Sequence, residues 1–132
     1  MEKLIIKQQA DTPAVVFLPH RKKYQISGPC WPENPAPVFD IIYDWVENHL
    51  ATTSGEDFIL YLKITFMNTS CSKHLLKLIN YILNLSDKND VKILWYYNPK
   101  DTEMFSEGRR FQELSGAGDQ LELIESDAIP SV

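Results

Sequence analysis

A run of small polar residues follows directly on the longest apolar strand that the sequence predicts. Residues 58–66 alternate as a strand, and Asn68, Thr69 and Ser70 come next, where a helix is expected to begin. The first turn of a helix carries backbone N–H groups without helical partners and the positive end of the helix dipole. A phosphoryl group on a side chain at that place therefore finds donors already in position. Thr69 is our candidate phosphorylation site, with Asn68 and Ser70 as its surroundings.

Helix capping is the alternative interpretation of the same residues, because Ser, Thr and Asn cap helices in general and a cap alone regulates nothing. Lys73 and Lys77 follow Thr69 at i+4 and i+8, so the three side chains form one stripe along the predicted helix. The usual meaning of such a stripe is a solvated face. It also suits a docked kinase, and it suits Lys73 as the counter-charge of a phosphate one turn away.

Cys71 supports a rival, enzymatic interpretation, because a thiol in the first turn of a helix can become nucleophilic. A thiol enzyme also needs a base or an anion-binding loop, and residues 71–74 contain one histidine and no glycine. Cys30 and Cys71 are too few for a disulfide framework and lack C-x-x-C spacing, so we expect reduced thiols. We predict that the protein is not an enzyme.

The sequence predicts neither a metal site nor a cofactor. His20, His49 and His74 lie in different predicted elements and have no cysteine at ligand spacing. The five glycines form neither a G-x-G-x-x-G pattern nor a Walker loop, so nothing is present to cradle a nucleotide. We therefore do not expect the chain itself to be a kinase.

Length and composition predict one domain over residues 1–132, with a flexible tail at residues 127–132. A chain with 44% hydrophobic residues can bury a core without metals or disulfides. The net charge of −5 argues against nucleic acid or anionic lipid as a partner. Since no segment approaches the roughly 20 apolar residues of a membrane span, we expect a cytoplasmic protein without membrane insertion. Its partners should be proteins.

The predicted elements follow the order β-β-α-β-α-β-α-β. Strands are expected at residues 14–18, 23–27, 58–66, 91–97 and 121–124, with a further short strand at 4–7, and helices at about 35–51, 70–86 and 102–114. Phe58, Leu60, Leu62, Ile64 and Phe66 make one dry face of the central strand. This pattern predicts an α/β (α+β) fold, in which a mixed sheet of five or six strands has three helices mainly on one face.

Four short segments carry a resemblance to a known family. They are Trp31-Pro32-Glu33-Asn34, Asp44-Trp45-Val46-Glu47, Met67-Asn68-Thr69-Ser70 and Leu94-Trp95-Tyr96-Tyr97-Asn98. With these segments in this order, the chain resembles the SiaC-family regulatory phosphoproteins of bacteria, from about residue 31 to about residue 114. The expected fold is also similar to the STAS fold of anti-sigma-factor antagonists, in which a phosphorylatable hydroxyl residue lies at a strand-to-helix junction.

The resemblance implies a non-enzymatic signalling protein that is phosphorylated on the threonine of the Asn-Thr-Ser element. A dedicated kinase would add the phosphate to Thr69, and a PP2C-type phosphatase would remove it. The unphosphorylated form would bind a diguanylate cyclase and promote its activity, which raises cyclic di-GMP. Lys73 matches a lysine of the family pattern. An anti-sigma-factor-antagonist-type partner switch is the alternative function, although that family's Asp-Ser-Ser-Gly-type phosphosite is absent from this sequence.

Residues before the first predicted helix complete the candidate surface. Trp31, Pro32, Glu33 and Asn34 are expected to contact a partner, together with Lys77. Two of them have a structural alternative, since Asn34 can cap the helix and Trp31 can cover the edge of the core.

Overall fold

Six strands form one mixed sheet in the computed structural model, which describes residues 1–126, so the predicted tail at 127–132 lies outside the described residues. The strands lie side by side in chain order: β1 Leu4–Ile6, β2 Ala14–Leu18, β3 Lys23–Cys30, β4 Asp57–Met67, β5 Asp90–Tyr97 and β6 Leu121–Glu125. The first three strands pair antiparallel, and β3 to β6 pair parallel. The predicted mixed sheet of five or six strands is confirmed, and it has six strands.

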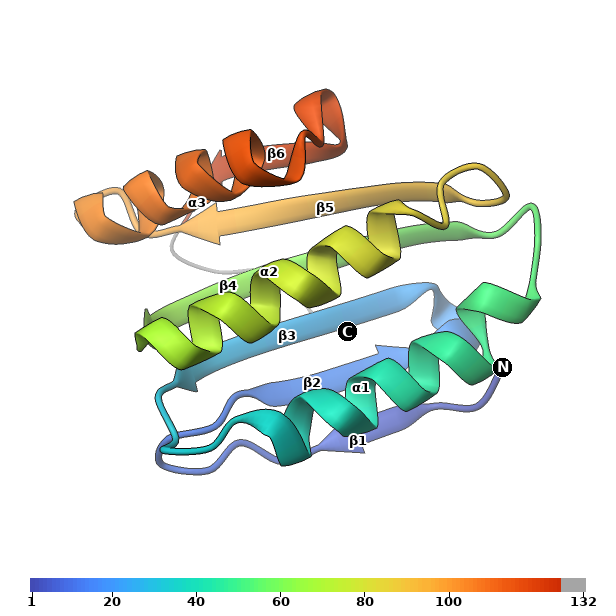
Figure 1. Cartoon of the computed structure of the whole chain (residues 1–132), viewed down its shortest axis with the longest axis horizontal. Coiled ribbons are helices and arrows are strands. Elements are labelled where there is room, and N and C mark those ends of the chain that lie inside the picture. The colour runs from blue at the N-terminus through green and yellow to red at the C-terminus, as the bar shows by residue number, and fades with distance from the viewer. Residues whose placement is uncertain (127–132) are drawn as a thin grey trace.

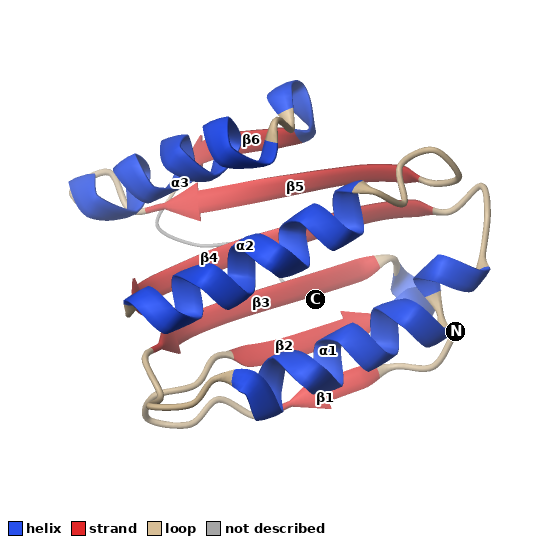
Figure 2. Cartoon of the chain, in the orientation of Figure 1, coloured by secondary structure: helices blue, strands red, loops and turns tan. Residues whose placement is uncertain are grey.

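Three helices connect the parallel strands. They are α1 Ala36–Asn48, α2 Thr69–Leu83 and α3 Thr102–Ser115, and short 3₁₀ turns lie at Pro19–Arg21, Leu50–Thr52 and Gly118–Gln120. Figures 1 and 2 show all three helices on the same face of the sheet. A connection between neighbouring parallel strands is right-handed, so strands added in one direction place their helices on one side. The predicted arrangement of three helices on one face is therefore confirmed.

The hydrophobic core lies between the sheet and this helical layer. Phe58, Leu60, Leu62 and Ile64 of β4 are buried in it, as their alternation predicts. Phe66 departs from the prediction and is 54% exposed. The register of β4 against β3 shifts between Ile64 and Phe66, so the alternation is broken at Thr65, and β4 has no pairing with β5 beyond Leu62. The end of β4 thus projects past the neighbouring strand.

The two cysteines form a disulfide, which corrects the expectation of reduced thiols. Cys30 ends β3 and Cys71 lies in the first turn of α2, with Cα atoms 6.0 Å apart and both side chains buried. Parallel pairing brings Cys30 opposite Met67 at the end of β4, so the two sulfurs meet although 41 residues separate them. A buried and bonded sulfur is no accessible nucleophile, and the structure gives the thiol-enzyme alternative no support.

Candidate functional site

The carboxyl ends of β3 and β4 bring the predicted site residues together. The backbone N–H of Asn68 donates to the carbonyl of Cys30 at 3.1 Å, and the Asn68 side chain donates to the carbonyl of Pro32, also at 3.1 Å. With the disulfide, these bonds fasten the start of α2 to the loop that follows β3. Two segments that the sequence analysis singled out separately thus form one surface.

Asn68, not Thr69, caps α2. Its side-chain oxygen accepts a hydrogen bond from the backbone N–H of Cys71 at 2.9 Å, which satisfies one of the donors in the first turn. Thr69 is the first helical residue and is exposed. Among residues 1–126, no group forms a hydrogen bond with the Thr69 hydroxyl. Since Asn68 takes the capping role, the Thr69 hydroxyl is not used by the fold, and Thr69 itself is an exposed residue.

Arg110 of α3 is a residue of this site that the sequence analysis missed. Its Nη2 donates to the Ser72 hydroxyl at 2.6 Å, and Ser72 lies on the first turn of α2, three residues after Thr69. The same guanidinium forms an ion pair with Glu107. Arg110 and Thr69 line one small cavity, whose walls are Met67, Asn68, Thr69, Ser72, Glu107 and Arg110. No local sequence signal predicts this approach, because α2 and α3 meet only through the fold.

The two predicted lysines lie on the outer surface of α2. Lys73 and Lys77 are both exposed, and neither forms an ion pair within residues 1–126. Lys73 follows Thr69 by one helical turn, as predicted, but the cavity beside Thr69 is lined by Arg110 and not by Lys73. The structure therefore offers a second cation next to Thr69, from a different helix.

The loop before α1 contains both exposed and buried members of the predicted partner surface. Trp31 is 46% exposed, and Glu33 and Asn34 are also exposed. Pro32 is buried, so its ring is not available to a partner and its carbonyl instead receives the bond from Asn68. The Asn34 side chain accepts a hydrogen bond from the backbone N–H of Ala36 at 3.2 Å, which supports the first turn of α1. The cap position of α1 is Pro35, so the predicted capping role of Asn34 is wrong, and its bond comes from the residue before the cap.

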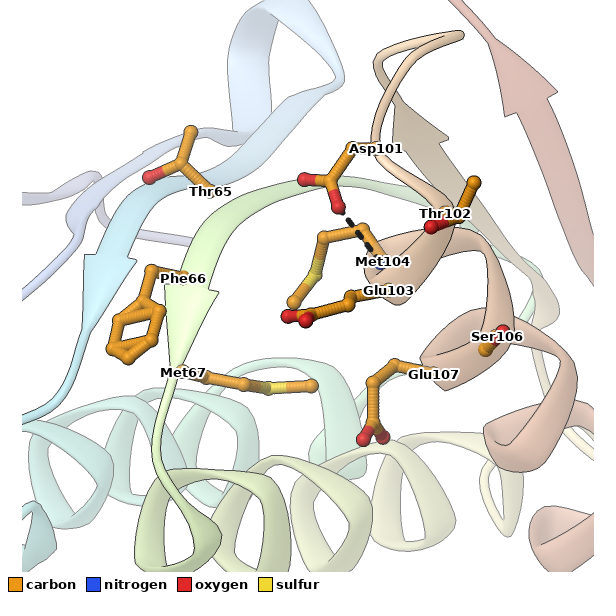
Figure 3. Close-up of a pocket in the computed structure, with 9 residues that line it drawn as sticks. All are labelled: Thr65, Phe66, Met67, Asp101, Thr102, Glu103, Met104, Ser106 and Glu107. Atoms are coloured by element: carbon orange, nitrogen blue, oxygen red, sulfur yellow. Dashed lines mark hydrogen bonds between the residues drawn. The ribbon is translucent and has the colours of Figure 1, made fainter.

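A larger acidic cavity of about 360 Å³ lies between the projecting end of β4 and the start of α3. In Figure 3 Met67 points from β4 toward α3, where Glu103 and Glu107 project from the opposite wall. Asp101 lines the same cavity and caps α3, because its carboxylate accepts a hydrogen bond from the backbone N–H of Met104 at 3.1 Å. Glu107 lines both this cavity and the smaller one beside Thr69.

Metal-binding clusters and membrane-spanning helices are both absent from residues 1–126. No group of three or more His, Cys, Asp or Glu side chains there could hold a metal ion. No helix there combines the length and the apolar character that crossing a membrane requires.

Comparisons with known proteins identify relatives of this chain. The family model described as "SiaC family regulatory phosphoprotein" matches residues 6–122. A Pseudomonas aeruginosa protein (strain UCBPP-PA14), described as uncharacterized, is 25% identical over 114 residues, which are 86% of this chain and 90% of the relative.

Solved structures from Pseudomonas aeruginosa have the same fold. Apo-SiaC matches with a TM-score of 0.80 and 21% identity, covering 96% of this chain and 100% of SiaC. A structure of the diguanylate cyclase SiaD in complex with its activator SiaC contains a chain that matches with a TM-score of 0.81 and 19% identity. That match covers 93% of this chain and 99% of the other. At these identities the structural likeness establishes the fold, and the family model establishes the relationship.

Proposed function

Because this chain belongs to the SiaC family of regulatory phosphoproteins, we propose that it is a non-enzymatic signalling protein that is switched by phosphorylation of Thr69 and binds a diguanylate cyclase. The observation that carries the proposal is the Thr69 hydroxyl, which is exposed at the start of α2 and has no hydrogen-bond partner within residues 1–126. The SiaC protein of the structural comparison is described as the activator of the cyclase SiaD. We extend that activity to this chain.

The modification itself requires a kinase and a phosphatase. A dedicated kinase transfers the γ-phosphoryl group of ATP to Thr69 Oγ1: the new O–P bond forms, the bond from Pγ to the leaving ADP breaks, and the hydroxyl proton is released. A PP2C-type phosphatase hydrolyses the product and restores the hydroxyl. Because Thr69 is exposed, we expect neither step to require movement of the fold.

Charge provides the physical basis of the switch. A phosphoryl group adds about −1.5 to −2 charge at neutral pH. That charge appears beside the acidic cavity that Asp101, Glu103 and Glu107 line, so like-charge repulsion and desolvation oppose a protein packed over this edge of the sheet. A coupling of about 1–3 kcal/mol changes affinity by roughly 5- to 150-fold, which is enough for a switch.

The partner surface is proposed to surround Thr69. Trp31 and Phe66 are large exposed apolar side chains at the ends of β3 and β4, and exposed aromatic residues often anchor protein interfaces. Glu33, Asn34, Lys73 and Lys77 supply a polar rim on the adjoining loop and on α2.

The test is a reconstituted assay with a diguanylate cyclase from the same cell, in which cyclic di-GMP production and binding of this chain are both measured. Thr69→Ala is expected to bind and activate the cyclase, whereas Thr69→Asp is expected to bind at least about fivefold more weakly. Intact-mass and peptide analysis after incubation with ATP and cell extract should locate one phosphate on Thr69 in the wild type and none in Thr69→Ala. Equal binding by Thr69→Asp and Thr69→Ala, with no phosphate on Thr69, would overturn the proposal.

A further inference from the structure

Arg110 is held beside the start of α2 by contacts on three sides. Its Nη2 donates to the Ser72 hydroxyl at 2.6 Å, and its Nε and Nη2 lie 3.0 and 2.9 Å from one carboxylate oxygen of Glu107. Its guanidinium carbon lies 5.5 Å from the ring centre of the buried Phe111. The guanidinium is therefore positioned before any ligand arrives, although its side chain remains 47% exposed.

The cavity between Arg110 and Thr69 has the size and lining that a phosphoryl group needs. Its volume is about 120 Å³, roughly the share of four water molecules in liquid water. Thr69 and Ser72 contribute hydroxyl groups from α2, and Arg110 contributes the positive charge from α3. The first turn of α2 adds the positive end of a helix of 15 residues.

We propose that Arg110 binds the phosphoryl group of phosphorylated Thr69 through its guanidinium. Until the phosphate is formed, Arg110 stays ion-paired with Glu107. This inference rests on the proposed phosphorylation of Thr69. A guanidinium binds phosphate bidentately through charge-assisted hydrogen bonds, and the phosphate brings up to about twice the charge of the carboxylate with which it competes. Arg110 has five N–H donors, so it can keep its bond to Ser72 while it turns from Glu107 to the phosphate.

The exchange carries the signal from the phosphate to the acidic cavity. Glu107 lines both cavities, and its carboxylate is neutralised by Arg110 in the unphosphorylated chain. When Arg110 moves to the phosphate, Glu107 loses its partner and stands with Asp101 and Glu103 as an unpaired acid. The total charge changes only by that of the phosphate, but part of the change then appears at the face between β4 and α3, where Glu107 has lost its counter-charge.

The test needs neither the kinase nor the cyclase, so its failure is distinguishable from failure of the proposed function. Phosphothreonine is incorporated at position 69 of the full chain by genetic code expansion, and the second ionisation of its phosphate is followed by ³¹P NMR. Arg110→Gln is compared with wild type. Arg109→Gln is the matched control, because Arg109 is exposed on the same helix and lines a different cavity.

The second pKa of the phosphate is expected to be at least about half a pH unit lower in wild type than in Arg110→Gln, because a nearby cation favours the dianion. Arg109→Gln should titrate as wild type does, and Glu107→Gln should titrate lower still because the competing carboxylate is gone. Arg110→Lys, which keeps the charge and loses the bidentate geometry, should fall between wild type and Arg110→Gln. An equal second pKa of the phosphate in wild type and Arg110→Gln would overturn the proposal. So would a result in which Lys73→Gln raises this pKa and Arg110→Gln does not.

A second measurement keeps the test decisive if Arg110→Gln does not fold. The Arg110 Nε–H resonance of the wild-type chain is compared with and without the phosphate, at low and at high salt. The proposal requires a phosphate-dependent shift of this resonance that shrinks as salt is added. An unchanged resonance would contradict it.

Discussion

The side-chain amide of Asn68 donates a hydrogen bond to the carbonyl oxygen of Pro32, over 3.1 Å. The oxygen of the same amide accepts the capping bond from the backbone of Cys71. One side chain therefore closes the first turn of α2 and attaches it to the loop that carries Trp31. Thr69 directly follows Asn68, so its position depends on both bonds.

Two replacements of Asn68 should distinguish how much each of the two bonds contributes to stability. Asn68→Ala removes both, and we expect a loss of about 1–3 kcal/mol in the free energy of unfolding, from the cap and from one hydrogen bond. Asn68→Asp keeps a capping acceptor and loses the donor to Pro32, so its loss should be about 1 kcal/mol. Urea unfolding measures both values. Equal losses in the two variants would show that the cap does not contribute.

The disulfide should make stability depend on redox conditions. Closing a loop across a sequence separation of 41 residues corresponds to about 4 kcal/mol in the chain-entropy model. We expect reductant to lower the unfolding midpoint of the wild type and to leave the double variant Cys30→Ala, Cys71→Ala unchanged. Alkylation of the unfolded, unreduced protein provides the check, since modification of two thiols would show that the bond had not formed.

Much of this fold follows from local pattern, as β4 and α2 illustrate. The alternation from Phe58 to Ile64 and the helical spacing of Leu75, Leu78 and Ile79 each identify one buried face without any knowledge of the neighbours. The boundary between them is marked by Asn68, whose preference for the cap position is intrinsic. Strand, helix and strand in sequence then imply the parallel connection.

The parts that sequence reasoning missed are contacts between distant segments. The disulfide depends on the parallel register that sets Cys30 opposite Met67, and the approach of Arg110 to Ser72 spans two helices. Exposure of Phe66 depends on the register shift between β3 and β4 just before it and on where β5 stops pairing with β4. Register and strand length are set by packing of the whole sheet, so the local sequence around these residues does not predict them.

Tyr24 should make the protein sensitive to alkali. Burial, with a smaller contribution from the charge of Glu56, raises the pKa of the Tyr24 phenol to about 12. An unfolded tyrosine ionises near pH 10, so the contribution of Tyr24 is complete below that value and is lost as pH rises toward 12. Stability should fall by at most about 1.4 kcal/mol per pH unit from this group.

Tyr24→Phe is the control for this dependence, because it keeps the ring and removes the proton. Burial also raises the pKa of Tyr43 and Tyr96, so some alkaline loss of stability will persist in the variant. The free energy of unfolding is measured in urea from pH 8 to about pH 12, the range that the two ionisations span. Identical slopes above pH 10 for wild type and Tyr24→Phe would contradict the assignment.

Trp31 and Phe66 should contribute more to partner binding than an equally exposed apolar residue elsewhere on the surface. Trp31→Ala and Phe66→Ala are each expected to weaken binding of the diguanylate cyclase by about 1–2 kcal/mol, or roughly 5- to 30-fold, because buried aromatic anchors dominate protein interfaces. Leu114→Ala is the matched control, since Leu114 is 55% exposed near the opposite end of α3 from the acidic cavity. Its effect on affinity should be below about 0.5 kcal/mol.

The same variants connect the surface to the phosphate. If Trp31 and Phe66 contact the partner directly, their effects should shrink in Thr69→Asp, where the partner is already displaced from this edge. Calorimetry on the single and double variants gives the coupling energy. Full additivity of Thr69→Asp with both aromatic substitutions would place the cyclase elsewhere on the molecule, and a loss of affinity in Leu114→Ala equal to that in Trp31→Ala would do the same.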